Sequence, residues 1–561
     1  MKELREIIKK AAKDAFGVDV ESELTRPEEQ FGDYSTNVAM QLAAELGKKP
    51  REIANQLVKK LQSPLVAKTE VAGPGFINFW LSDQALAGLL DVKPVQKLAG
   101  QEVVVEYSDP NPFKILHVGH LYTSVVGDAI AKLLEATGAN VHRVNFGGDV
   151  GLHVGKTMWA IFDTLTNSSM NEIQAYDELL KISAKKLDEK TAWLAEQYIK
   201  GTTAYEENEE NKTQIIIFSK KVYHLHAVKD HESNFAKVYW TCRQWSYEYF
   251  DEFYARIGSH FEKYYPESET VSPGMKAVQE NIGKVFTRSD GAIVYKGEVH
   301  NLHTRVFINS QGLPTYETKD VGLILKKWED YHFDKSVVIT GNEIYEYMQV
   351  VLRAVEQFAP ELVQKTTHIT HGLVKLAGGA KMSSRSGNII KADDVLEAAA
   401  AANVRINKQE NANTALGAVK YAFLKHRIGA DIIFDPAESV SLQGNSGPYL
   451  QYALVRAKSI LKKSKVKSQK SKVEEFEPDE RSLARKISEY PEIVENAVNE
   501  LMPHHICTYI YELAQNFNRF YETNRVIGDP REALRLQLVG SYANVLKNGL
   551  ELLNIPVPEK M

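Results

Sequence analysis

Cysteine, long apolar runs and excess positive charge are all scarce in this sequence. Only two of its 561 residues are cysteines, Cys242 and Cys507, and they lie far apart in the chain. Such a pair gives neither a disulfide framework nor a cysteine-rich zinc site, so we expect a reducing, cytoplasmic environment. No segment is long and apolar enough to span a bilayer, and the opening residues MKELREII mix acids with bases, unlike a signal peptide. We therefore expect no membrane partner.

The net charge of −5 at pH 7 argues against a protein that coats nucleic acid indiscriminately. Such binding depends on many contacts from lysine and arginine to phosphates. A shaped RNA could still bind local basic patches, and residues 462–472 form a dense lysine-rich run. Two interpretations of this run stay open, a solvated linker, which its composition favours, and an RNA contact.

The length of the chain predicts several domains, because 561 residues exceed what one core usually fills. Residues 1–94 are typical of a separate α+β domain, with two helices divided at Gly47 and Pro50 and a turn and strand over 71–80. Residues 436–561 lack strand signals and carry long amphipathic helices, which predicts an all-α bundle.

Residues 95–435 read as an α/β domain. Strand 102–107, an amphipathic helix and strand 141–146 predict a right-handed crossover and a doubly wound, Rossmann-like parallel sheet. Strands at 337–341 and 369–374 return to it. The stretch of about 151–285 interrupts this pattern, and we interpret it as a helical insertion whose aromatic residues are either core or, less simply, stacking surfaces for RNA bases.

Two motifs indicate an ATP site. His117-Val118-Gly119-His120 follows a strand and a proline-rich turn and opens a helix, where backbone amides and the helix dipole attract phosphate. Displacement at the α-phosphorus needs donors and cations on the developing charge. His117 and His120 could donate to phosphate oxygens, Gly119 would let the nucleotide approach, and Mg²⁺ is expected with ATP. Three basic residues could neutralise pyrophosphate, namely Lys114, Lys381 and Arg385.

A resident metal is not expected. His117 with His120, or His300 with His303, has no third and fourth ligand at a suitable spacing.

These motifs resemble the HIGH and KMSKS signatures of class I aminoacyl-tRNA synthetases, and the whole chain is similar to the arginyl-tRNA synthetases. The supporting stretches run nearly end to end: 31–39, 71–79, 108–111 with Lys114, 313–320, 381–385, 447–453, 532–535 and 555–561. Their order and coverage make the resemblance specific.

The resemblance implies an arginine–tRNA ligase that activates L-arginine with ATP to arginyl-adenylate and transfers it to the terminal ribose of the arginine tRNA. It also implies that activation requires bound tRNA. The arginine contacts it implies are Glu106, Asn111, His117, Tyr316, Asp320 and Gln349. The ATP contacts it implies are Lys114, His117, Gly119, His120, Lys381, Met382 and Ser383. Carboxylates suit a guanidinium, which offers five donors and a fixed charge.

The first domain resembles the unit that binds the tRNA elbow, and the last resembles the DALR anticodon-binding domain. The plausible anticodon contacts in the last domain are Tyr509, Tyr511, Asn516, Phe520 and Tyr521. We expect a monomer.

One departure from the KMSKS signature is Ser384, which stands where its second lysine belongs. The resemblance implies that Lys114 compensates. The alternatives are another class I synthetase, a small-molecule nucleotidylyltransferase and a non-catalytic tRNA-binding paralogue. The two flanking domains speak against the second, and the retained His117, His120, Lys114 and Lys381 speak against the third.

Overall fold

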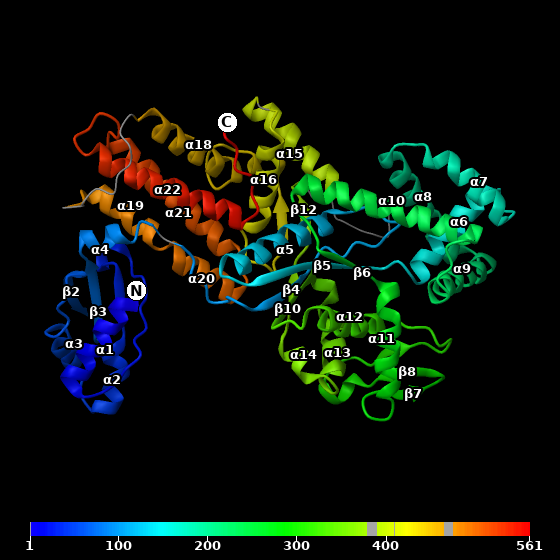
Figure 1. The fold of residues 1–561 in the computed structure, drawn as a ribbon, viewed down its shortest axis with the longest axis horizontal. Coiled ribbons are helices and arrows are strands. Elements are labelled where there is room, and N and C mark those ends of the chain that lie inside the picture. Colours follow the sequence, from blue (N-terminus) through cyan, green and yellow to red (C-terminus); the bar gives the residue numbers. More distant parts are fainter. Residues whose placement is uncertain (1, 92, 378–389, 409, 465–474, 561) are drawn as a thin grey trace.

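The computed structural model describes residues 2–91, 93–377, 390–408, 410–464 and 475–560. Figure 1 shows an elongated molecule in which a small N-terminal unit lies below a C-terminal helical bundle, with an α/β unit in the middle and a cluster of helices at the far end. Among the described residues, no helix combines the length and the apolar character needed to cross a membrane.

The N-terminal unit has the predicted α+β character. Its order is α1 (Lys2–Phe16), a 3₁₀ turn (Glu29–Phe31), β1 (Tyr34–Thr36), α2 (Val38–Leu46), α3 (Pro50–Val58), β2 (Val66–Ala72), β3 (Phe76–Leu81) and α4 (Asp83–Gly88). The strands form an antiparallel sheet in the order β1-β3-β2. Helix α2 ends before Gly47, which is left-handed with φ 59°, and Pro50 opens α3, where its missing N–H is not needed.

The central sheet is parallel throughout and has the order β11-β10-β4-β5-β6. Its strands are β4 (Glu102–Glu106), β5 (Asn140–Gly147), β6 (Lys263–Pro266), β10 (Lys335–Gly341) and β11 (Thr366–His371). Helix α5 (Val118–Ala136) joins β4 to β5. The chain builds outward from β4 to β6 and then returns to β10 on the other side, so the strand order reverses between β4 and β10. Ligands bind at the carboxyl ends of strands at such a point.

The expected helical insertion over 151–285 is wrong at its C-terminal end. Helices α6 (Leu152–Thr166), α7 (Glu172–Ser183), α8 (Leu187–Glu207), α9 (Glu209–Ala227) and α10 (Asn234–Ile257) form it around their own aromatic core. However, β6 belongs to the main sheet, and α11 (Glu267–Glu280) follows it. Strand β6 is four residues long, ends in proline and continues an aromatic-rich stretch, so no periodicity marked it. The buried Tyr239, Trp245, Phe250 and Phe253 are core.

Smaller elements complete the central unit. An antiparallel sheet that was not predicted contains β7 (Thr287–Ser289), β8 (Ala292–Tyr295) and β9 (Arg305–Ile308). A 3₁₀ turn at Gly297–His300 lies between β8 and β9. Helices α12 (Tyr316–Tyr331), α13 (Tyr345–Glu356) and α14 (Pro360–Gln364) flank β10, which a 3₁₀ turn (Asn342–Ile344) follows. Strands β12 (Val374–Leu376) and β13 (Ile432–Phe434) pair in parallel, and α15 (Ala392–Asn407), α16 (Ala412–Leu424) and α17 (Pro436–Ser439) lie beside them in sequence.

The C-terminal bundle contains α18 (Gly447–Lys463), α19 (Pro478–Ser488), α20 (Tyr490–Glu500), α21 (His504–Thr523) and α22 (Glu532–Leu552). Of the suggested anticodon contacts, Tyr509 and Phe520 are buried in its core. Most of the lysine-rich run lies outside the described residues.

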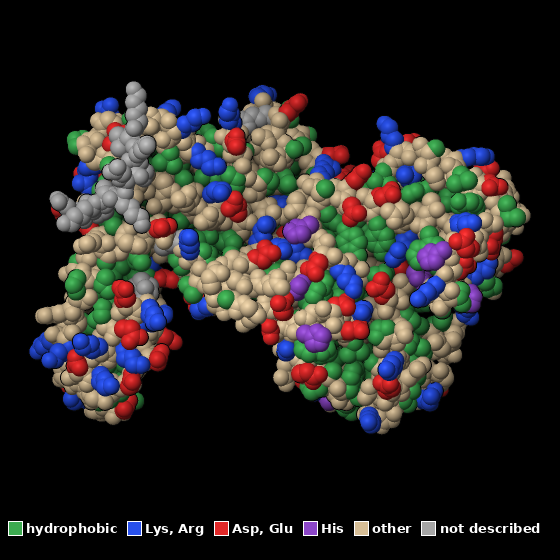
Figure 2. Space-filling model, in the orientation of Figure 1, with side chains coloured by type: hydrophobic (Ala, Val, Ile, Leu, Met, Phe, Trp, Pro, Cys, Tyr) green, Lys and Arg blue, Asp and Glu red, His purple; other side chains and the backbone are tan. Residues whose placement is uncertain are grey.

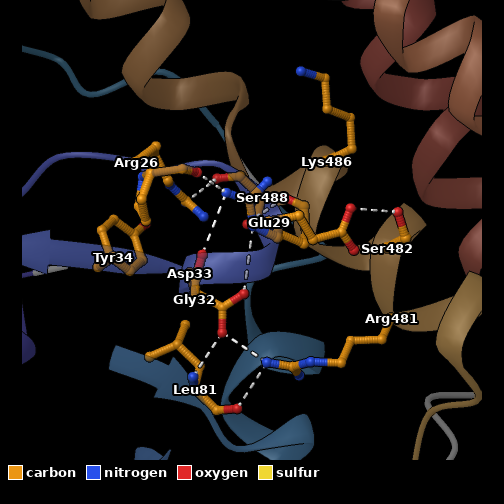
Figure 3. Close-up of polar contacts among 12 residues, drawn as sticks. Arg26, Glu29, Gly32, Asp33, Tyr34, Leu81, Arg481, Ser482, Lys486 and Ser488 are labelled. Atoms are coloured by element: carbon orange, nitrogen blue, oxygen red, sulfur yellow. Dashed lines mark hydrogen bonds and ion pairs between the residues drawn. The ribbon is translucent and has the colours of Figure 1, made fainter. Parts of the chain in front are cut away.

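An ion-pair network joins the first and last units (Figure 3). Arg481 of α19 donates to Asp33 over 2.7 Å. It also donates to Asp83 over 2.6 Å. Asp33 is only 2% exposed and also accepts from the backbone N–H of Leu81 over 2.7 Å. Arg26 of the N-terminal unit donates to Glu492 of α20 over 2.9 Å. The aspartate of the 31–39 stretch therefore has a structural role in docking the two units.

Candidate active site

A cleft of about 560 Å³ opens at the carboxyl ends of the central strands. Residues at the ends of four strands line it, namely Glu106 of β4, Phe146 of β5, Thr340 of β10 and His371 of β11. The first turn of α5 closes one side through His117, Gly119 and His120. The cleft therefore lies where the strand order predicts a ligand, and it contains the first of the two sequence motifs.

The turn between β4 and α5 is strained and is held by its own polar side chains. Ser108 (φ 75°) and Asp109 (φ 48°) are left-handed without being glycine, which costs of order 1–3 kcal/mol each. Asp109 accepts from the N–H of Phe146 over 2.8 Å, and Asn111 accepts from the N–H of Gly148 over 2.7 Å. These bonds fasten the turn to the end of β5. They use the amide oxygen of Asn111 and leave its NH₂ group at the cleft for a ligand.

Backbone N–H groups hold each of the two motif histidines in one tautomer. The Nδ1 atom of His117 accepts from the N–H of Gly119, and the Nδ1 atom of His120 accepts from the N–H of His117, both over 3.1 Å. A neutral imidazole that accepts at Nδ1 carries its proton at Nε2. The rings stack with their centroids 3.9 Å apart. Both histidines therefore offer an Nε2–H donor at the start of α5.

These imidazoles are neutral at physiological pH. Burial lowers the pKa of His117 to about 4, and the positive charge of Lys114 lowers it further in the same direction. Burial also lowers the pKa of His120 well below its ordinary value, with His117 and Lys114 contributing. A Cβ atom on Gly119 would lie 2.9 Å from the His117 ring, so this glycine also makes room for the imidazole.

The segment that directly follows the second motif contacts the first motif. Residues Lys381, Met382, Ser383 and Arg385 lie outside the described residues. Directly after that segment, Ile390 accepts from the N–H of Val118 over 3.0 Å, and Lys391 forms a bridge with His117. Lys114 does not line the cleft; its Nζ lies 4.7 Å from the ring centroid of Tyr198 in α8. Segments 274 positions apart are thus joined by backbone pairing at the start of α5.

The other half of the cleft is acidic. Glu106 is 3% exposed and is paired with the buried Lys327, so its charge already has a partner. Asp320 instead accepts a hydrogen bond from the hydroxyl of Tyr347, and burial raises its pKa to about 7. Tyr316 is 55% exposed at the cleft, so it is not a core residue. Gln349 lies on α13 and is not among the lining residues.

Several lining residues were not found from the sequence. Tyr347 binds Asp320, Glu267 is paired with the buried Lys319, and Arg305 lies 3.4 Å from Glu317. At the other side, His371 and the hydroxyl of Thr123 lie 2.6 Å apart. None of these residues lies in a motif, because their proximity arises from strands and helices that are remote in sequence. Among the described residues, no group of three or more His, Cys, Asp or Glu side chains is placed to hold a metal ion.

Comparison with known proteins places each part of the chain. Residues 2–81 match the arginyl tRNA synthetase N terminal domain, residues 85–435 match the tRNA synthetases class I (R) catalytic domain, and residues 450–561 match the DALR anticodon binding domain. An arginine–tRNA ligase of Clostridium perfringens is 30% identical, and the match covers 95% of each chain. The chain belongs to the arginine–tRNA ligase family.

Solved structures agree with this family membership. The arginyl-tRNA synthetase of Thermus thermophilus is 25% identical and superimposes with a TM-score of 0.78, covering 100% of both chains. The Plasmodium falciparum arginyl-tRNA synthetase, 21% identical, has the same fold, with a TM-score of 0.78 over 100% of this chain and 99% of that one. The predicted resemblance, fold class and enzyme class, a class I aminoacyl-tRNA ligase, are confirmed.

Proposed function

We propose that this protein activates L-arginine with ATP and attaches it to the 3′-terminal ribose of the arginine tRNA. One observation carries the proposal. The same cleft is lined on one side by the neutral N–H donors at the start of α5 and on the other side by acidic residues. One of these, Asp320, has no bonded cation among the described residues. A nucleotide phosphate suits the first side, and a guanidinium suits the second.

In the first step, a carboxylate oxygen of arginine attacks the α-phosphorus of ATP, the bond to the β-phosphate oxygen breaks and pyrophosphate leaves. The Nε2–H groups of His117 and His120 would donate to the phosphate oxygens as charge develops. One such donor is worth roughly 3 to 4 kcal/mol in comparable sites. Lys114, Lys381 and Arg385 would neutralise the departing pyrophosphate. In the second step, a ribose hydroxyl of the tRNA attacks the arginyl carbonyl, AMP leaves and the ester forms.

Arginine would be selected by its guanidinium. Asp320 is a cleft carboxylate whose charge no bonded lysine or arginine balances among the described residues, and Tyr316, exposed beside it, would add a phenolic partner. Asn111 would donate through its NH₂ group, while Glu106, His117 and Gln349 complete the implied set. The ammonium group of lysine has three donors and no planar fork, whereas a guanidinium has five donors, so lysine would leave acceptors unpaired.

Mg²⁺ would arrive with ATP, bound by phosphate oxygens and water. Among the described residues no group of carboxylates is placed to hold it, and Glu106 and Glu267 are each paired with a lysine. No step above depends on a protein-bound metal.

The flanking units would hold the tRNA. Lysine and arginine side chains gather on the visible face of the N-terminal unit, with acidic ones beside them (Figure 2), and such charge suits the tRNA elbow. In the bundle, Tyr511, Asn516 and Tyr521 are only partly buried. We propose that they contact splayed anticodon bases. The two cysteines are buried and free, which fits the cytoplasm. We propose a monomer as the active form, which sedimentation of the active enzyme would test.

Pyrophosphate exchange with arginine, glutamate, cysteine or lysine, each with and without arginine tRNA, tests the proposal. We expect exchange with arginine alone among these, and only when tRNA is present. Exchange driven by another amino acid would overturn the substrate, and no exchange with any would favour a non-catalytic tRNA-binding protein. Arginine exchange without tRNA would remove only the tRNA requirement.

A further inference from the structure

A buried polar cluster joins the end of the C-terminal bundle to the back of the cleft. Its centre is Asp128 of α5, which is 2% exposed. Asp128 accepts from the hydroxyl of Tyr107 over 2.6 Å, from the hydroxyl of Ser259 and from the side-chain NH₂ of Asn554 over 3.1 Å. Tyr107 directly follows β4, Ser259 follows α10 at the end of the helical insertion, and Asn554 lies after α22 near the C-terminus.

Asn554 makes hydrogen bonds through its side-chain amide and through its backbone carbonyl. Its side chain also donates to the carbonyl of Gly258 over 3.0 Å, and its own carbonyl accepts from Lys420 over 2.7 Å. Lys420 is 1% exposed, so this carbonyl is a bonded partner of a buried ammonium. The residue lies two positions after the end of α22 and is left-handed with φ 51°, a conformation that asparagine adopts more readily than most residues.

Asp128 in turn holds two walls of the cleft. It lies on the same helix as His120, eight residues or about 12 Å further along the axis. Its other partner, Tyr107, immediately precedes the strained turn at Ser108 and Asp109. The Tyr107 ring lies against α5 at Gly127, where a Cβ atom would come within 2.1 Å of the ring. A shift of Asp128 would therefore move both the imidazole donors and the turn.

From this connection we propose that Asn554 is a positioning residue, which acts through Asp128 to hold α5 and the 108–109 turn in the geometry that arginine activation needs. The proposal rests on the proposed arginine activation. Asn554 touches no substrate, and its effect is on the chemical step rather than on binding.

The test uses Asn554→Gly in the full-length enzyme. Glycine accepts the positive φ and keeps the carbonyl that binds Lys420, so the change removes only the amide side chain. The matched control is Asn544→Ala, an exposed asparagine on α22. Exchange and aminoacylation are measured at 25 °C together with the thermal unfolding midpoint.

We expect Asn554→Gly to lower kcat about tenfold, equivalent to 1.36 kcal/mol, with KM for arginine, ATP and tRNA within about twofold. Asn544→Ala should match the wild type. In an Asp128→Asn background, the further loss caused by Asn554→Gly should shrink to about twofold or less, because the partner is already altered.

Several outcomes would overturn the inference. One is a lower unfolding midpoint with an unchanged kcat, and another is an equal tenfold loss in the Asp128→Asn background. If Asn554→Gly does not fold, the isosteric Asn554→Asp, which sets a second carboxylate against Asp128, must show the kcat loss; if both unfold, Asn554 is merely structural. An inactive wild type rejects the proposed function and this inference together, whereas an active wild type with an equally active variant rejects the inference alone.

Discussion

Arginine binding should depend on pH because of Asp320. Burial raises the pKa of this carboxyl to about 7, although Tyr347 donates a hydrogen bond that favours the charged form. A guanidinium stays charged throughout and requires the ionised carboxylate. The free enzyme must therefore lose the Asp320 proton before or as arginine binds, so affinity should rise with pH through 7 and level off above it.

The size of the effect follows from the pKa. At pH 6, one unit below it, roughly one Asp320 in eleven is ionised, so arginine should bind about tenfold more weakly than at pH 8. The pKa values of His117 and His153, lowered by burial to about 4 and about 3, keep these groups neutral across this range. They contribute no titration of their own.

Calorimetric titration of L-arginine between pH 6 and 8, in two buffers with different ionisation enthalpies, measures both affinity and proton release. We expect release of nearly one proton at pH 6 and almost none at pH 8. Asp320→Asn should bind more weakly and without this pH dependence. The reasoning is refuted if wild-type affinity is flat across the range, or if Asp320→Asn keeps the same slope.

Three further predictions concern stability and catalysis. Lys327→Met should lower the free energy of unfolding in urea by about 3–5 kcal/mol, because it leaves Glu106 buried and unpaired. The control variant Lys326→Met, at a more exposed neighbouring lysine, should lower it by less than about 1 kcal/mol. Similar losses in the two variants would contradict the pairing. Gly127→Ala should lower stability by about 1–3 kcal/mol in thermal unfolding through its clash with Tyr107, while Gly540→Ala, with open space around the new Cβ atom, should not. Lys114→Ala should slow adenylate formation far more than it weakens tRNA binding, and equal exchange rates in mutant and wild type would reject that role.

Local patterns in the sequence were sufficient for the main elements. Strands at 102–107, 141–146 and 337–341 are apolar runs bounded by polar residues, and they form β4, β5 and β10. Gly47 and Pro50 divide α2 from α3 for backbone reasons that need no tertiary partner. The four-residue β6 was missed because its identity as a strand depends on pairing with β5, which its own residues do not encode.

The sequence by itself determined the family, the parallel sheet and the histidines at the start of α5, because short motifs and periodicity are local properties of the chain. Only the tertiary structure decided which polar groups share the cleft. The pairing of Glu106 with Lys327 spans 221 positions, and that of Asp128 with Asn554 spans 426. Tyr347 at Asp320 is likewise a contact between two helices. Charge and protonation depend on such neighbours and on burial, which exist only once the chain is folded.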